Sequence, residues 1–299
     1  MNKNQNTSFG RSLSFEFFPP ATTEATLRLW RSVERLAPLG PKFVSVTYGA
    51  SGTTRDRTLA AIKTIQDRAR IAVAGHLTCV GATREETLNV AREYKRLGVQ
   101  KIVALRGDPP KGEAAFHPHP DGFASSVELV EALKSELDLE ISVGAYPEKH
   151  PEAADTNADV EHLKRKLDAG ASNAITQFCF ETEDFLRFRD KCAAAGITQP
   201  ILPGILPVEN FQKMCSFAGR CGASVPAWMH EAFSHATDEA SQTLLATAIA
   251  SEQCDQLFSE GINHLHFYTL NNPDLTYGIA RAIGFETKSL TTAAGNGAA

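Results

Sequence analysis

Several features that mark particular classes of protein are missing from this chain. It has no run of about 18 apolar residues, which a membrane-spanning helix would need. Basic residues are not in excess, since 30 Lys and Arg stand against 35 Asp and Glu, so no basic stripe is present to neutralise nucleic-acid phosphates. The N-terminal stretch MNKNQNT lacks the apolar core of a signal peptide. We therefore expect a cytoplasmic protein whose partners are neither nucleic acid nor membrane.

Metal-binding and redox motifs are also scarce. The six cysteines form no C-x-x-C pair, and scattered cysteines in a reducing compartment are mostly small buried apolar residues. His117-Pro118-His119 superficially resembles a metal pair, but no third ligand of suitable spacing follows it. We predict no metal site and no redox role for the cysteines.

Apolar runs typical of β-strands recur at intervals of roughly 30 residues, the length of a strand–helix–strand unit. Most are continuous rather than alternating, as expected for parallel strands covered by helices. Amphipathic stretches lie between them, including one that begins at a capping box of Thr83 and Glu86 and stops at Gly98, and others at 155–167 and 209–219. The eight predicted strands are 13–18, 43–47, 73–78, 101–106, 141–146, 173–180, 201–206 and 264–269.

Eight such units predict an α/β fold, a single (β/α)₈ TIM barrel over residues 1–290. The tail at 291–299, TTAAGNGAA, has no side chain able to anchor it and is predicted to be disordered. The alternative fold is a doubly wound open sheet. It is disfavoured because no strand is followed by G-x-G-x-x-G, the glycines with which such a sheet approaches a dinucleotide. No linker rich in Gly, Pro or Ser divides the chain, so we predict one domain.

A carboxylate ends the first predicted strand, in the sequence SFEFFPP. Glu16 lies between Phe15 and Phe17, and apolar surroundings raise the pKa of a carboxyl because they disfavour its charged form. A raised pKa suits a general acid near neutral pH. The alternative is a solvent-facing strand residue, since alternation alone does not decide which way the side chain points.

Two proline-stiffened polar loops follow neighbouring predicted strands. ALRGDPP, after the fourth strand, contains the cation Arg106 and the anion Asp108, and by itself it can also be an ordinary tight turn stabilised by an Arg–Asp pair. AYPEKHPE, after the fifth strand, offers the side chains of Tyr146 and His150. Because the C-terminal ends of barrel strands meet at one rim, the two loops together indicate a shared pocket.

Three other positions carry polar or aromatic groups near the same rim. Gln177 closes the sixth apolar run. His76 lies in a predicted strand, where a histidine is usually satisfied by a backbone partner but can also face a ligand. Helical periodicity alone predicts Phe217 to be a core contact of its helix.

Taken together, eight motifs in order resemble the methylenetetrahydrofolate reductases. They are SFEFFPP, VTYGASGTTRDRT, GHLTC, ALRGDPP, AYPEKHPEA, KRKLDAGASNAITQFCFE, LPGILPV and HFYTLN. The resemblance runs from about residue 13 to residue 285. An ordered series of this kind is far more specific than any single motif.

The resemblance implies a flavin-dependent barrel enzyme that interconverts 5,10-methylenetetrahydrofolate and 5-methyltetrahydrofolate. In that family a nicotinamide nucleotide, NADH or NADPH, reduces non-covalent FAD, which then reduces the folate in a ping-pong sequence. The implied FAD-binding residues are Thr47, His76, Leu105, Arg106, Gly107, Asp108, Ala124, Tyr146, His150, Asp159 and Lys166. A cation at Lys166 would offset the charge of the cofactor's pyrophosphate.

Catalytic and folate-binding roles are implied by the same resemblance. Glu16 matches the general acid that protonates N10 of the folate, so that the methylene bridge opens to an iminium. Asp108 matches the acidic residue whose charge stabilises that cation. Gln177 suits a pterin edge, Thr47 contributes to the substrate site, and Phe217 packs against whichever substrate stacks on the flavin, contrary to the core role that periodicity predicts.

Two residues depart from the family pattern. Asn272 stands where some relatives carry arginine after TLN, which puts a contact to the folate's acidic tail in doubt. Phe123 stands where some relatives have tyrosine, so a hydroxyl contact to the cofactor is expected to be missing. The choice between NADH and NADPH and the physiological direction stay open, while the resemblance implies a homo-oligomer.

Two other functions fit a barrel of this type. One is a different flavin-dependent oxidoreductase of the proline dehydrogenase type. The other is a pterin-binding methyl-transfer barrel that binds folate but no flavin. The fold alone does not separate them, because this barrel hosts many functions.

Overall fold

The computed structural model describes residues 10–48, 55–109, 112 and 116–288. Its strands run parallel to one another in a single sheet, in the order β7-β6-β5-β4-β3-β2-β1-β9-β8. The predicted tail at 291–299 lies outside the described residues, as do residues 49–54 of one motif. The strands are β1 Ser12–Phe17, β2 Phe43–Val46, β3 Val73–Thr78, β4 Lys101–Leu105, β5 Glu140–Ala145, β6 Asn173–Thr176, β7 Ile201–Leu202, β8 Gly204–Ile205 and β9 His264–Tyr268.

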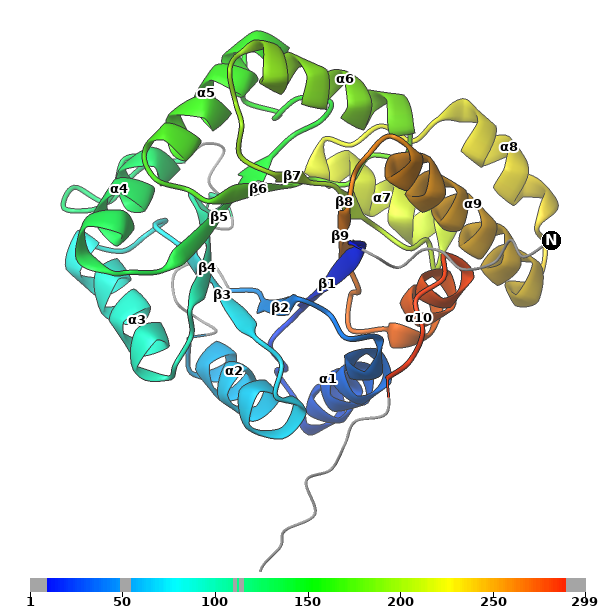
Figure 1. Cartoon of the computed structure of the whole chain (residues 1–299), viewed down its shortest axis with the longest axis horizontal. Coiled ribbons are helices and arrows are strands. Elements are labelled where there is room, and N and C mark those ends of the chain that lie inside the picture. The colour runs from blue at the N-terminus through cyan, green and yellow to red at the C-terminus, as the bar shows by residue number, and fades with distance from the viewer. Residues whose placement is uncertain (1–9, 49–54, 110–111, 113–115, 289–299) are drawn as a thin grey trace, which may run out of the picture.

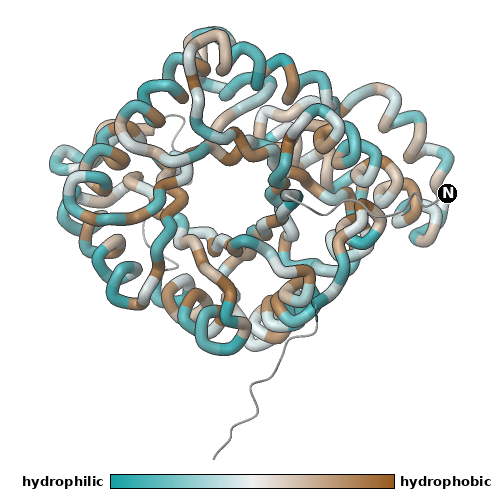
Figure 2. The backbone as a smooth tube through the Cα atoms, viewed as in Figure 1, coloured by the Kyte–Doolittle hydropathy of each residue, from teal (hydrophilic) through white to brown (hydrophobic). Residues whose placement is uncertain are grey.

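Helices surround this sheet on its outside (Figure 1). Hydrophobic residues gather on the strands and on the inner faces of the helices, while the outer faces are mostly hydrophilic (Figure 2). Within the described residues, no helix is long and apolar enough to cross a membrane. The helices are α1 Thr23–Leu36, the 3₁₀ turn η1 Ala37–Leu39, α2 Arg55–Ala69, α3 Arg84–Arg96, α4 Ser126–Glu136, α5 Thr156–Asp168, α6 Thr182–Ala194, α7 Phe211–Cys221, α8 Ala227–His235, α9 Glu239–Ser259 and α10 Pro273–Ala282.

The sheet closes into a barrel, as predicted, and the alternative of an open sheet is wrong. β1 pairs with β2 on one side and with β9 on the other. The predicted strand 201–206 is divided into β7, which pairs with β6, and β8, which pairs with β9. Pro203 separates the two pieces, and proline has no N–H to donate to a ladder. The eight predicted strands therefore become nine, with the interrupted strand completing the ring.

Local signals in the sequence place the helices close to their predicted bounds. Thr83 and Glu86 form the predicted capping box at the start of α3. The helix predicted at 209–219 begins two residues later, because the side chain of Asn210 caps it by accepting a hydrogen bond from the N–H of Lys213 at 2.9 Å.

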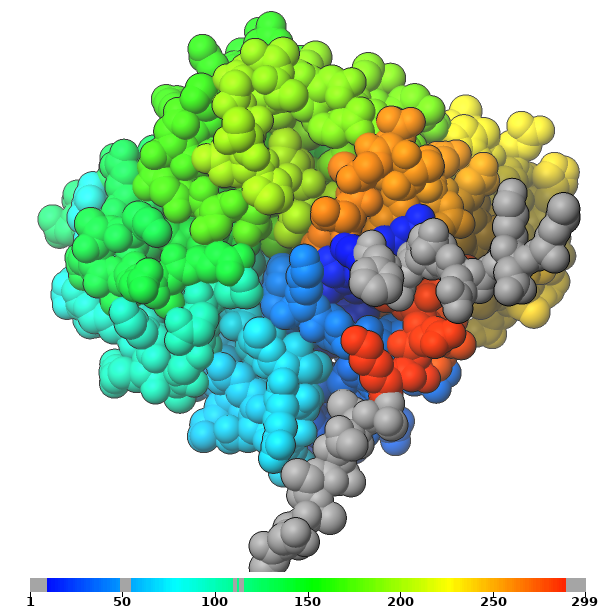
Figure 3. All heavy atoms as spheres, viewed as in Figure 1, coloured from blue at the N-terminus to red at the C-terminus, as the bar shows by residue number. Residues whose placement is uncertain are grey.

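Atoms fill the middle of the ring on the face drawn in Figure 3, so the barrel has no open channel at that face.

Candidate active site

Two adjoining cavities lie at the C-terminal ends of the strands. The central cavity, of about 420 Å³, is lined from β1, β3, β4, β5, β6 and β9, from the loops after β2, β4, β5 and β6, and from α7. The outer cavity, of about 310 Å³, lies beside it between the ends of β4 and β5 and the helices α4 and α5. The residues that line both are Leu105, Arg106, Gly144, Tyr146 and His150. The two cavities therefore form one elongated site with two lobes.

Glu16 lies at the wall of the central cavity, with 15% of its side chain exposed. Its Oε2 is 3.4 Å from Nε2 of His76 and 3.8 Å from Nε2 of His266. Burial raises the pKa of this carboxyl, and the nearby His76 opposes that shift. Burial also lowers the pKa of His76. The carboxyl is thus inside the barrel, not on an outer edge, and its surroundings favour the protonated form.

Aromatic rings and an amide also line the central cavity. Phe217 of α7 stacks on Phe178, with ring centroids 5.6 Å apart and an angle of 23° between the rings. Both rings line the cavity, as does Gln177. Oε1 of Gln177 accepts a hydrogen bond from the N–H of Phe178 at 3.1 Å. Phe217 is therefore packed against the core on one side, as periodicity predicts, and lines the cavity on the other, while its contact with a substrate stays a prediction.

The loop after β4 brings Gly107 and Asp108 to the mouth of the central cavity. Gly107 has a φ of 91°, and a Cβ there would lie 2.5 Å from Cγ1 of Val80. Only glycine fits this turn without displacing β3's end. Asp108 is exposed to solvent, and its carboxylate lies on the same cavity as Glu16. The predicted pair of carboxyls therefore shares one pocket.

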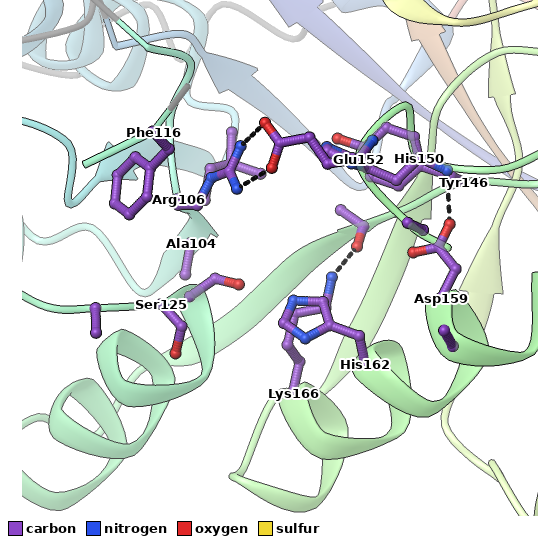
Figure 4. A pocket seen from close by; sticks show the side chains of 16 residues that line it. Ala104, Arg106, Phe116, Ser125, Tyr146, His150, Glu152, Asp159, His162 and Lys166 are labelled. Atoms are coloured by element: carbon purple, nitrogen blue, oxygen red, sulfur yellow. Dashed lines mark hydrogen bonds and ion pairs between the residues drawn. The ribbon is translucent and has the colours of Figure 1, made fainter. Parts of the chain in front are cut away.

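A buried cation marks the outer cavity. Lys166 of α5 is 6% exposed, and its Nζ donates a hydrogen bond to the carbonyl of Gly144 at 2.5 Å (Figure 4). Burial lowers the pKa of Lys166 to about 8, an effect that Asp159 opposes. Asp159 in turn accepts a hydrogen bond from the N–H of His150 at 2.7 Å. A buried ammonium held by one carbonyl has unused hydrogen-bonding capacity, which an anionic ligand can satisfy.

Arg106 stands between the two cavities and pairs with Glu152, not with Asp108. Its two terminal nitrogens contact the carboxylate of Glu152 at 2.5 and 2.8 Å, a bidentate ion pair that reaches from β4 to the loop after β5 (Figure 4). The Arg106 guanidinium also lies 4.7 Å from the ring centre of Phe116. The simple turn with an Arg–Asp pair is therefore wrong. Neither Glu152 nor Phe116 was predicted as a site residue: Glu152 belongs to the marked loop AYPEKHPE, but its pairing with Arg106 carries no sequence signal, and Phe116 lies outside the predicted strand ends.

The remaining predicted residues divide between cavity lining and other roles. Thr47 lines the central cavity and Ala124 the outer one. Phe123 is fully buried, with the Arg84 guanidinium 4.6 Å above its ring, and it lines neither cavity. Asn272 caps α10. It does not line the central cavity either, so its effect on folate binding stays a prediction.

Within the described part of the chain, two buried polar atoms of β3 line the central cavity without a hydrogen-bond partner, and one of them belongs to Thr78, which was not predicted as a site residue. Thr78 lines the central cavity, and among the described residues its buried hydroxyl oxygen has no hydrogen-bond partner. Nε2 of His76, which lies 3.4 Å from Oε2 of Glu16, is likewise buried and has no hydrogen-bond partner among those residues. Such atoms are uncommon in folded proteins and indicate a ligand or water in the cavity. A strand-end threonine is too ordinary for the sequence to single out.

A closed parallel barrel with a two-lobed cavity at its strand ends has the architecture of a TIM-barrel enzyme. The model of the family described as methylenetetrahydrofolate reductase matches residues 3–284. The chain is 48% identical to 5,10-methylenetetrahydrofolate reductase of Escherichia coli strain K12 over 274 residues, which is 91% of this chain and 90% of that protein. This chain belongs to the methylenetetrahydrofolate reductase family.

A plant protein is similar to this chain in sequence, and one solved structure is similar to it in fold. Methylenetetrahydrofolate reductase (NADH) 1 of Arabidopsis thaliana is 34% identical over 93% of this chain and 49% of its own length. An uncharacterized protein from Clostridium thermocellum, described as binding two copies of 5-methyl-5,6,7,8-tetrahydrofolic acid, superposes with a TM-score of 0.59 at 17% identity. That superposition covers 91% of this chain and 94% of the other and supports the barrel fold alone.

Proposed function

We propose that this protein interconverts 5,10-methylenetetrahydrofolate and 5-methyltetrahydrofolate, using NADH or NADPH and a non-covalently bound FAD in a ping-pong sequence. The observation that carries the proposal is the environment of Glu16. This residue is a buried carboxyl with a raised pKa, at the wall of a large cavity, in a chain of the methylenetetrahydrofolate reductase family. Opening the methylene bridge of the folate needs a proton at N10, and a neutral carboxylic acid can supply it.

The two-lobed cavity fits an elongated cofactor with a flat ring system at one end and a diphosphate further along. Lys166 and Arg106 offer positive charge to a diphosphate in the outer cavity, where the buried Lys166 donates to the carbonyl of Gly144. In the central cavity Thr47, His76, Tyr146 and the loop of Gly107 would hold the ring system. The buried hydroxyl of Thr78, which has no hydrogen-bond partner among the described residues, supports a polar ligand there.

When bound, FAD supplies hydride transfer between the nicotinamide and the folate. The protein's own residues would do the rest. Glu16 would hold a proton on Oε2 and pass it to N10 of the folate. Asp108 would place a negative charge beside the iminium that follows, and Gln177 would bind the pterin edge with its amide. Phe217 would pack on the bound substrate and exclude water.

The decisive experiment adds 5-methyltetrahydrofolate to the purified, oxidised protein without oxygen and follows the flavin absorbance. Bleaching of the flavin is expected, because the folate then passes its hydride to FAD. A flavoprotein that is not bleached by this folate but is bleached by an amino acid would instead be an oxidoreductase of the proline dehydrogenase type. A protein that binds the folate but takes up no flavin would be a pterin-binding methyl-transfer barrel.

A first prediction concerns the identity of the flavin. Heat-denatured protein should release FAD, with no FMN, when its supernatant is separated by chromatography. FMN lacks the adenylate half and its phosphate, and would leave part of the outer cavity without a ligand. Release of FMN, or failure of the protein to take up either flavin, would remove the basis of the two-lobed assignment.

A second prediction concerns Lys166. Its pKa of about 8 in the ligand-free protein means that part of the cation is lost above that pH. A bound diphosphate favours the ammonium form and raises this pKa, so FAD affinity should fall as the pH rises above about 8. The variant Lys166→Met removes this buried charge. It should weaken FAD binding at least roughly tenfold at neutral pH, and it should also remove the pH dependence of FAD affinity.

The measurement is a fluorescence titration of the apoprotein with FAD across the pH range. Lys164→Met is the matched control, because Lys164 lies on the same helix but pairs with Asp168 at 2.8 Å on the surface. Equal weakening in both variants would show that α5 needs its lysines for stability, and Lys166 would then have no special relation to the cofactor.

A further inference from the structure

A line of hydrogen-bonded side chains runs through the inside of the barrel below Glu16. Ser12 and Ser14 of β1 stand in register with His264 and His266 of β9. Oγ of Ser12 is 2.8 Å from Nδ1 of His264, whose Nε2 is 2.8 Å from Oγ of Ser14. Oγ of Ser14 is in turn 2.7 Å from Nδ1 of His266. We call these four residues the Ser–His column.

The column is buried and its rings are fixed in place. His264 and His266 are 3% and 1% exposed, so solvent does not compete for their nitrogens. Phe43 of β2 stacks on both imidazoles, with ring centroids 5.8 and 5.9 Å away. Burial lowers the pKa of each histidine to about 3, so both rings are neutral near pH 7. A neutral imidazole has one N–H and one lone pair, and each contact in the column therefore depends on the one before it.

The lower end of the column sets the direction of every hydrogen. Oγ of Ser12 lies 3.1 Å from the carbonyl oxygen of Asn263, and this contact is attractive only if the hydroxyl donates to it. Ser12 then accepts from Nδ1–H of His264. Nε2 of His264 consequently accepts from Ser14, and Ser14 accepts from Nδ1–H of His266. This arrangement satisfies all four contacts and leaves Nε2 of His266 with a lone pair.

That lone pair faces the acid. Nε2 of His266 is 3.8 Å from Oε2 of Glu16 and has no hydrogen-bond partner among the described residues. The distance is longer than a hydrogen bond, so the interaction is electrostatic. A lone pair disfavours the carboxylate beside it, whereas an N–H in the same place would favour it.

We propose that Ser12, His264, Ser14 and His266 are positioning residues that turn an imidazole lone pair toward Glu16 and so hold its carboxyl in the acid form. This inference rests on the proposed function, in which Glu16 is the proton donor. Other groups that face the column or the acid are Lys42 before β2, Lys101 on β4, His76 on β3, Tyr268 on β9 and Asp108 after β4.

The test reverses the direction of the hydrogen bonds in the Ser–His column by changing a residue far from Glu16. In His264→Phe the stacking on Phe43 is kept, but Ser14 loses its acceptor and can donate only to Nδ1 of His266. The proton of His266 then moves to Nε2 and points at Glu16. Nitrogen NMR of ¹⁵N-histidine-labelled, ligand-free protein reads the tautomer directly. We expect Nδ1–H at His266 in the unmodified protein and Nε2–H in the variant.

The second readout is the pH dependence of the folate half-reaction. With an N–H facing it, Glu16 ionises at lower pH, so its acid form is lost earlier as the pH rises. The alkaline limb of flavin reoxidation by methylenetetrahydrofolate should move down by roughly one pH unit, the scale of shift that such contacts cause. The pH profile of flavin reduction by NADH should not move, because that step needs no proton from Glu16.

A second variant and a matched control keep the test decisive. Ser12→Ala removes only the anchor at the lower end and should shift the tautomer of His266 in the same sense, even if His264→Phe does not fold. Ser142→Ala changes a buried serine of β5 outside the column. It should leave unchanged both the tautomer of His266 and the alkaline limb of flavin reoxidation. Nε2–H at His266 in the unmodified protein would overturn the proposal, as would an unmoved tautomer in Ser12→Ala or an equal shift in Ser142→Ala. Absence of any folate reaction would instead contradict the proposed function, while the tautomers still test the column.

Discussion

Glu16→Gln is expected to slow flavin reoxidation by methylenetetrahydrofolate at least roughly 10²-fold, the lower end for general acid catalysis. The substitution keeps the size and hydrogen-bonding shape of the side chain and removes only its acidic proton. Flavin reduction by NADH should stay near normal, because hydride transfer to the cofactor protonates no folate nitrogen. Stopped-flow absorbance, with each half-reaction started separately and without oxygen, measures both rates.

The comparison between half-reactions distinguishes chemistry from architecture. Glu16 lies 3.4 Å from His76, a residue of the same cavity, so its replacement can also disturb the wall that holds the flavin. Equal slowing of both half-reactions would show that Glu16 shapes the site and does not donate the proton. No slowing of either would exclude it from the chemistry, despite its place in the cavity.

Asp108→Asn should leave FAD binding largely intact and slow folate turnover by at least roughly tenfold. The carboxylate lies at the mouth of the central cavity, and loss of one preorganised charge beside a developing cation costs several kcal/mol in comparable sites. FAD affinity should survive because the turn itself depends on Gly107 and the charge of Arg106 is matched by Glu152. Steady-state kinetics and a flavin titration of the same preparation give the two quantities.

Glu152→Gln provides the contrast for this variant. Glu152 is also a carboxylate near the cavity, but it lies in the loop after β5 and pairs with Arg106. Its replacement frees Arg106 and removes no charge from beside the proposed iminium. Folate turnover that is unchanged in Asp108→Asn, or reduced equally in both variants, would assign Asp108 to the turn alone.

The barrel and its rim were predictable because each depends on local sequence. Strand-like runs at regular spacing define the units, and polar residues at their ends define the rim, so the place of Glu16, Gln177 and the two proline-stiffened loops at one cavity was predictable. Alternation along β1 left the direction of Glu16 undecided. Its register with Ser45 of β2 and Tyr268 of β9 decides it, and register between distant strands is a property of the closed sheet.

Contacts between separate loops could not be predicted in the same way. The bidentate pair of Arg106 and Glu152 joins residues 46 positions apart in sequence, and the nearer carboxylate at Asp108 was the natural partner by spacing. The break at Pro203 was visible as a residue type, but its effect depends on which neighbour each half of the strand pairs with. The serines and histidines below Glu16 are unremarkable in sequence, and only the pairing of β1 with β9 brings them together.

That pairing also has a consequence for the order in which the protein is made. β1 emerges from the ribosome first, and its partner β9 lies about 250 positions later, Ser14 and His264 being separated by 250 residues. Domains fold as units once their chain is available, and such distant contacts form late. A nascent chain shorter than about 264 residues can pair β1 with β2 but cannot surround Glu16. Glu16 therefore acquires its full environment only once β9 has been made, and a chain truncated before β9 would lack the strand that pairs with β1 beside it.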